Sequence, residues 1–110
     1  MTIVNNKYNI ITLCGSFKFK EEFMNVQEKL ILEGNIVFTP NFFKISEAEI
    51  TAKKRKMLDE MHRQKIDMSN EIYVINLGGY IGESTKSEIE YAKAKGKKIS
   101  YLENIKNYLE

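Results

Sequence analysis

Short apolar runs alternate with longer amphipathic stretches along this chain. An apolar run of four to seven residues bounded by turn residues is typical of a buried strand, and apolar positions spaced three and four apart indicate a helix. Strands are therefore predicted at 9–14 (NIITLC), 36–39, 71–77 (EIYVINL) and 97–102. Helices are predicted over 17–33, 46–69, 85–95 and 103–110. Gly34 and Gly96 stand just past two of these helices, where glycine commonly ends a helix.

Strands that alternate with helices predict right-handed crossovers and a parallel sheet. We expect an α/β fold, a three-layer sandwich with a small parallel sheet in the order 2-1-3-4, flavodoxin-like or Rossmann-like. One domain should span residues 1–110. The first helix should pack its Phe19, Phe23, Val26 and Leu30 face on the sheet. The long helix should pack a face formed by Ile50, Met57, Met61 and Met68.

In that strand order the first and third strands are neighbours, and their connections leave in opposite directions. Ligands bind at this switch point, outside the carboxyl ends of the strands. The loops Gly15-Ser16 and 78–84 (GGYIGES) both open there. The two glycine-containing loops are therefore expected to form one crevice.

Composition narrows the function only slightly. The 110 residues are 43% hydrophobic and 29% charged, with a net charge of +2 that favours neither polymeric nucleic acid nor a membrane surface. No apolar run reaches membrane-spanning length, and the first residues do not resemble a signal peptide. A single cysteine, Cys14, suits a reducing cytoplasm. One histidine and one cysteine argue against a structural zinc site, and we expect neither a metal nor a cofactor.

Glu88 is the leading candidate for chemistry, because it lies one turn inside a helix that follows the second loop. A carboxylate in this position can attack an anomeric carbon. The same residue also completes a capping box with Thr85, in which it would only close the helix terminus. Both interpretations are open at this stage. Glu83, in the same loop, is either a second carboxylate available for chemistry or a solvated loop charge.

The first loop offers a weaker signal for an anion. Gly15, Ser16, Lys18 and Lys20 can cradle a phosphate at a helix N-terminus, or form an ordinary strand-to-helix junction capped by Ser16. Four aromatic residues in or near the crevice loops can stack on a base or simply pack, namely Phe17, Phe42, Phe43 and Tyr80.

The long helix carries a polar stripe formed by Asp59, Arg63 and Asp67. It is either a catalytic acid held by an arginine or a solvated ladder of ion pairs. His62 is expected on the surface of this charged helix. Cys14, at the end of an apolar strand, is expected to be a small buried hydrophobic residue.

These motifs together resemble the nucleoside 2-deoxyribosyltransferase-like superfamily, which includes nucleoside 5′-monophosphate N-glycosidases. The similarity runs from residue 10 to residue 102, through Cys-Gly-Ser after the first strand, the strand EIYVIN, and GKKI. Its most specific part is Glu-Ile-Glu-Tyr-Ala at 88–92, which is similar to the family's Glu-Leu-Gly-x-Ala. The resemblance implies that Glu88 is the nucleophile. It also implies a helix aspartate near position 63, with Asp59 and Asp67 one turn to either side.

The sequence therefore predicts cleavage or exchange of the N-glycosidic bond of a 2′-deoxynucleoside or its 5′-monophosphate. The alternatives are a non-catalytic nucleotide-binding module in the same crevice and a scaffold without a ligand. Expected catalytic residues are Glu88, Asp67 and Asp59. Expected substrate-binding residues are Gly15, Ser16, Phe17, Lys18, Gly79, Tyr80, Gly82, Glu83 and Ser84. A homodimer or larger homo-oligomer is expected, since 110 residues close a crevice poorly and the related enzymes share sites between subunits.

Overall fold

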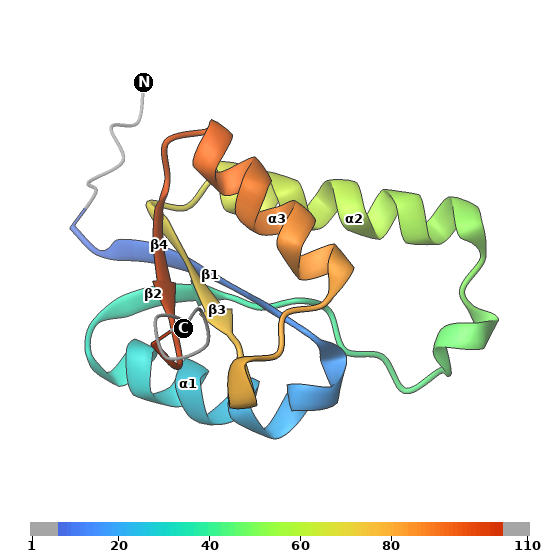
Figure 1. Cartoon of the computed structure of the whole chain (residues 1–110), viewed down its shortest axis with the longest axis horizontal. Helices are drawn as coiled ribbons and strands as arrows, with labels where there is room; N and C mark the ends of the chain where they lie inside the picture. The colour runs from blue at the N-terminus through green and yellow to red at the C-terminus, as the bar shows by residue number, and fades with distance from the viewer. Residues whose placement is uncertain (1–6, 105–110) are drawn as a thin grey trace.

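The computed structural model describes residues 7–104, which form a parallel four-stranded sheet with helices on both faces (Figure 1). The strands are β1 (Asn9–Gly15), β2 (Asn35–Phe38), β3 (Glu71–Ile75) and β4 (Lys98–Tyr101). The helices are α1 (Lys20–Leu32), α2 (Ala52–Asp67) and α3 (Glu83–Ala94). The sheet order is β2-β1-β3-β4, so the predicted fold class and strand order are confirmed. The strand bounds lie within two residues of the predicted ones.

Strand β1 lies in the interior of the sheet and is buried on both faces. It pairs with β2 on one side and with β3 on the other, where Leu13 stands opposite Tyr73. Alternate side chains point to opposite layers: Ile11 and Leu13 pack with α1, whereas Cys14 packs with α2 and α3. Two-sided burial explains why this strand reads as a continuous apolar run.

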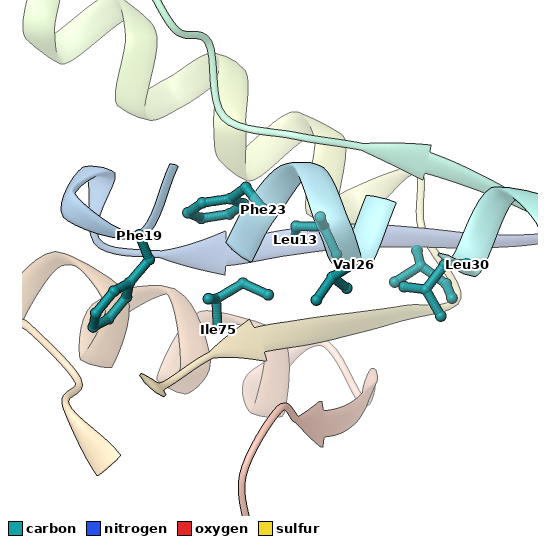
Figure 2. Close-up of a cluster of buried hydrophobic side chains, with 7 residues drawn as sticks. Leu13, Phe19, Phe23, Val26, Leu30 and Ile75 are labelled. Carbon is teal, nitrogen blue, oxygen red and sulfur yellow. The ribbon is translucent and has the colours of Figure 1, made fainter. Parts of the chain in front are cut away.

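The layer formed by α1 is closed by an apolar core (Figure 2). Leu13 and Ile75, on the sheet, pack against the face formed by Phe19, Phe23, Val26 and Leu30, as the helical spacing predicted. Phe23, which is 1% exposed, is the largest fully buried side chain in residues 7–104. This core fixes α1, and with it the loop that follows β1.

The opposite layer is formed by α2 and α3, and here the predicted core stripe is wrong. Met57, Met61 and Met68 are exposed, whereas His62 and Ile66 are buried. The buried face therefore lies one residue further along the helix than the methionines. Leu58, partly buried one turn before His62, continues it. The prediction that His62 lies on the surface is wrong for the same reason.

The predicted 46–69 helix is also interrupted near its start. A 3₁₀ turn at Glu47–Glu49 is followed by an extended Ile50, and α2 begins only after Thr51. The Thr51 hydroxyl accepts a hydrogen bond from the Lys54 amide at 3.2 Å, which caps the new helix. An extended, capping threonine cannot also continue a helix that precedes it. Figure 1 shows the first half of α2 extending beyond α3.

The two other helices start differently from the sequence prediction. Ser16 caps a 3₁₀ turn at Phe17–Phe19, with its hydroxyl 3.3 Å from the Lys18 amide, and α1 follows this turn. Helix α3 begins at Glu83, with Gly82 as its N-cap, so Thr85 is an interior residue. The capping box of Thr85 and Glu88 is therefore wrong, because neither residue is at the terminus that such a box closes.

The chain ends are only partly described. Glu103 and Asn104 are not helical, and the rest of the expected 103–110 helix lies outside the described residues. Gly96 follows α3 with a φ of +71°, as expected for a glycine that ends a helix. Within residues 7–104, none of the helices has the length and apolar character needed to cross a bilayer.

Candidate functional site

A cavity of about 920 Å³ opens at the carboxyl ends of β1 and β3. These strands are neighbours, and β1 leads into α1 on one face of the sheet while β3 leads into α3 on the other (Figure 1). The diverging connections leave room between the loops, as expected at a topological switch point. Ligand pockets for small molecules typically measure about 300–1,000 Å³, so the cavity can hold a nucleoside-sized molecule.

Glu88 lines this cavity from the second turn of α3. Only 20% of its side chain is exposed. Ile89, the next residue, packs in the core between α3 and the sheet, which fixes the rotation of the helix and turns Glu88 toward α2. The carboxylate is therefore held on a rigid element, with no capping role to occupy it.

Three side chains from three elements meet at the inner end of the cavity. His62 of α2 has its Nε2 atom 3.6 Å from Oε1 of Glu88. The same Nε2 atom lies 3.5 Å from Sγ of Cys14, at the end of β1. Cys14 is fully buried, and His62 is 8% exposed. The buried Nδ1 atom of His62 has no hydrogen-bond partner in the described part of the chain.

Burial disfavours the charged form of all three groups. It raises the pKa of Glu88 from 4.5 to about 7; the charge of Asp59 adds to this increase, while the Cys14 thiol and Arg63 oppose it. Burial also lowers the pKa of His62 from 6.5 to about 4, assisted by the positive charge of Lys65. The pKa of Cys14 is raised by burial and then by the nearby Glu88. Perturbed carboxylates in a cavity are common at functional sites.

The outer wall of the cavity is aromatic and basic. Phe17 and Phe42 make an edge-to-face contact with ring centroids 5.6 Å apart. Lys18 places its ammonium group 3.3 Å from the centre of the Tyr80 ring, a cation–π contact that holds the two crevice loops together. A planar base can stack on such rings, and an anionic group can approach the lysine.

The segment after β2 forms one side of the cavity and is fixed by α2. Lys65 donates hydrogen bonds to the carbonyl oxygen of Thr39 at 2.8 Å and to Oδ1 of Asn41 at 3.2 Å. Arg55 donates a hydrogen bond to the carbonyl oxygen of Glu47. These bonds hold the aromatic residues after β2 against the cavity.

Most of the residues predicted for the site lie together. The cavity is lined by Gly15, Ser16, Phe17, Lys18, Asp59, Tyr80, Gly82, Glu83, Ser84 and Glu88. Gly79, at the end of the 3₁₀ turn Leu77–Gly79, does not line it. Asp67 lies away from it, where its Oδ1 atom accepts a hydrogen bond from the Tyr91 hydroxyl at 2.7 Å. Of the two candidate aspartates, only Asp59 faces the cavity.

The sequence pattern did not indicate that His62 and Cys14 lie together beside Glu88. The signal for His62 was its spacing of four residues from both Leu58 and Ile66, which places it on the apolar face of α2. Cys14 is buried as expected, but it faces the side chains of His62 and Glu88 as well as an apolar core. No pattern within β1 could indicate those neighbours, because they belong to α2 and α3.

The sequence matches no protein-family model, and no curated protein is significantly similar to it. The geometry of the site and the motifs in its loops and helices are therefore the basis for its function.

Proposed function

We propose that this protein cleaves or exchanges the N-glycosidic bond of a 2′-deoxynucleoside or its 5′-monophosphate, with Glu88 as the nucleophile. The observation that carries this proposal is the position of Glu88. Its carboxylate is four-fifths buried, lines a cavity of nucleoside size, and has no part in capping α3. The similarity of residues 88–92 to the superfamily motif supports the same role.

The reaction has two steps. In the first, a carboxylate oxygen of Glu88 bonds to C1′ of the sugar while the bond from C1′ to the base nitrogen breaks. In the second, water or another base attacks C1′ and releases Glu88. The transition states resemble an oxocarbenium ion, which a nearby negative charge stabilises. A poorly solvated carboxylate is well suited to attack C1′ and to stabilise this positive charge once it has lost its proton.

Asp59 is the residue that we assign to assist the leaving base. It lines the same cavity from α2, and its charge acts on Glu88. The base acquires a proton as it leaves, and the Asp59 carboxylate can relay that proton from water in the cavity, which lowers the barrier. Asp67 is not assigned this role, because it accepts a hydrogen bond from Tyr91 outside the cavity.

The remaining lining residues suit the other parts of a nucleotide. Phe17, Phe42 and Tyr80 supply aromatic faces or edges for the base. Ser16, Lys18 and the N-terminus of α3 offer a hydroxyl, a cation and free amide groups for the sugar or a 5′-phosphate. We also propose a cytoplasmic location, because one unpaired cysteine suits a reducing compartment.

Release of free base tests the proposal directly. The untagged protein is incubated with a panel of deoxynucleosides and deoxynucleoside monophosphates, with and without a second base, and the products are separated by chromatography. Glu88→Gln keeps the shape of the side chain but removes the nucleophilic charge. Glu90→Gln is the matched control, since Glu90 is exposed on the same helix.

Base release by the wild type and by Glu90→Gln, lost in folded Glu88→Gln, is the expected result. Undiminished release in Glu88→Gln would refute the nucleophile. A nucleotide that raises the melting temperature without releasing base would instead support the non-catalytic binding module, which the aromatic and basic wall favours.

A further inference from the structure

The only histidine and the only cysteine of this chain lie side by side at the inner end of the cavity, next to Glu88. One histidine and one cysteine are too few for a structural zinc site, which commonly needs four cysteine or histidine ligands. A site with an open position needs only three protein ligands, and one of them can be a carboxylate. The structure brings together such a set.

We propose that Cys14, His62 and Glu88 form a binding site for a zinc-like divalent transition metal, through Sγ, Nε2 and a carboxylate oxygen. These three atoms lie within 4.8 Å of one another. Tetrahedral zinc holds sulfur at about 2.3 Å and nitrogen at about 2.0–2.1 Å, so neighbouring ligand atoms should be about 3.3–3.6 Å apart. The separations of 3.5 Å from Sγ to Nε2 and 3.6 Å from Nε2 to Oε1 match this spacing.

The ligands come from rigid elements and do not depend on a mobile loop. Cys14 is in β1, His62 in the second half of α2, and Glu88 in the second turn of α3. Ile66 and Ile89, which are buried near them along these helices, fix the helix positions. A metal would therefore bind with little rearrangement, which favours affinity.

The imidazole is available in the form that a metal binds. Nε2 points at both Cys14 and Glu88, while Nδ1 has no partner in the described residues. The proton of the neutral ring can therefore sit on Nδ1 without breaking a hydrogen bond, which leaves the Nε2 lone pair for the metal.

The donor set selects the class of metal. A thiolate and an imidazole are ligands for zinc, cobalt or copper, whereas magnesium and calcium prefer sites made only of oxygen. His62 and Glu88 line the cavity while Cys14 lies fully buried behind them. The fourth position on the metal would therefore open toward the cavity, where water or a ligand can occupy it.

Metal binding would compete with the proposed reaction, because a Glu88 oxygen bonded to the metal cannot attack C1′. This consequence rests on the proposed function, but the metal site does not. If both hold, zinc inhibits base release and a chelator restores it.

Cobalt is the first probe, because it reports its ligands in the absorption spectrum. Untagged, chelator-treated protein is titrated with Co²⁺ alone, without nucleotide. The expected result is one Co²⁺ per chain, with a thiolate-to-cobalt charge-transfer band in the near ultraviolet and strong visible bands of four-coordinate cobalt. Cys14→Ala should remove the charge-transfer band, and Glu90→Gln, the matched control, should leave the spectrum unchanged.

Zinc titration by calorimetry then tests the other two ligands. His62→Gln and Glu88→Gln should each lower the zinc affinity by at least about tenfold, the smallest loss usually seen even for partners outside the ligand shell. Thermal melting of each variant in the presence of chelator shows whether it is folded. If one ligand variant does not fold, the other two still test the site. Absence of a charge-transfer band in the wild type, or equal affinity in all folded variants, would overturn the proposal. A metal-bound spectrum without base release would separate the two proposals, supporting this one and not the glycosidase.

Discussion

The pKa shifts of His62 and Glu88 have opposite effects on how stability depends on pH, so they should cancel in the wild type. Substituting either residue should remove the cancellation. In the folded protein, burial keeps Glu88 protonated up to a pKa of about 7 and His62 neutral down to a pKa of about 4. In the unfolded chain the ordinary values are 4.5 and 6.5. Between these values the folded pair carries its proton on Glu88 and the unfolded pair carries it on His62. The proton count is equal, so this pair leaves the free energy of unfolding nearly independent of pH.

Replacing His62 with glutamine removes the histidine's pKa shift and leaves that of Glu88 uncompensated. The pKa of Glu88 is higher in the folded state, so its stabilising effect is complete below pH 4.5 and disappears as the pH rises through about 7. The difference between about 7 and 4.5 corresponds to about 3 kcal/mol. His62→Gln should therefore lose about 3 kcal/mol of stability across this window, relative to the wild type.

Glu88→Gln should show the opposite slope. The pKa of His62 is lower in the folded state, so its stabilising effect is complete above pH 6.5 and disappears as the pH falls through about 4. The difference between 6.5 and about 4 again corresponds to about 3 kcal/mol. The stability of Glu88→Gln should therefore rise by about that amount, relative to the wild type, as the pH increases.

Urea unfolding followed by circular dichroism, at intervals from pH 4 to pH 8 with a chelator present, measures these slopes. All other ionisable groups are shared by the wild type and the variants, so differences between the curves isolate the pair. Glu90→Gln should run parallel to the wild type, because Glu90 is exposed. Parallel curves for His62→Gln and Glu88→Gln would refute the reasoning, since burial would then not control either pKa.

Three further predictions concern activity, packing and assembly. In chelator, kcat/KM for base release should rise with pH through about 7, because Glu88 attacks only when ionised; a rate that falls over this range would contradict its role. Gly15→Ala should lower the thermal stability by about 1–3 kcal/mol, because a Cβ atom there would lie 2.9 Å from the carbonyl oxygen of Ile75; an unchanged melting temperature would show that β1 and β3 can separate freely. Light scattering at micromolar concentration should give the homodimer or larger oligomer expected from the sequence, and a mass of 12.8 kDa would contradict it.

The sequence alone was sufficient for the order of the elements and the place of the crevice. The alternation of apolar runs with helical spacing predicts βαβ crossovers, which constrain a small parallel sheet to few strand orders. In the order found here, the loops after β1 and β3 must open at the same point. The pattern of strands and helices was therefore enough to place Ser16 and Ser84 near each other. The strand order brings their loops together whatever the details of side-chain packing.

Packing decided the rotation of the helices, and with it the chemistry of the site. On α2, two rows of residues, one through Met57 and Met61 and the other through Leu58 and His62, have the same helical spacing. They differ by one residue, which is about 100° of rotation. Propensity does not distinguish such rows, and the pattern pointed to the methionines. Contact with the sheet and α3 buried the other row and turned His62 toward Glu88.

The tertiary structure likewise decided the role open to Glu88. Within the sequence, a threonine three residues before a glutamate is the signature of a capping box. In the fold, α3 begins at Glu83, so its N-terminus no longer needs that glutamate. Burial between α2 and β1 then raised its pKa to about 7, which depends on neighbours far away in the chain. Desolvation is a property of three-dimensional surroundings, and for that reason no local pattern could predict it.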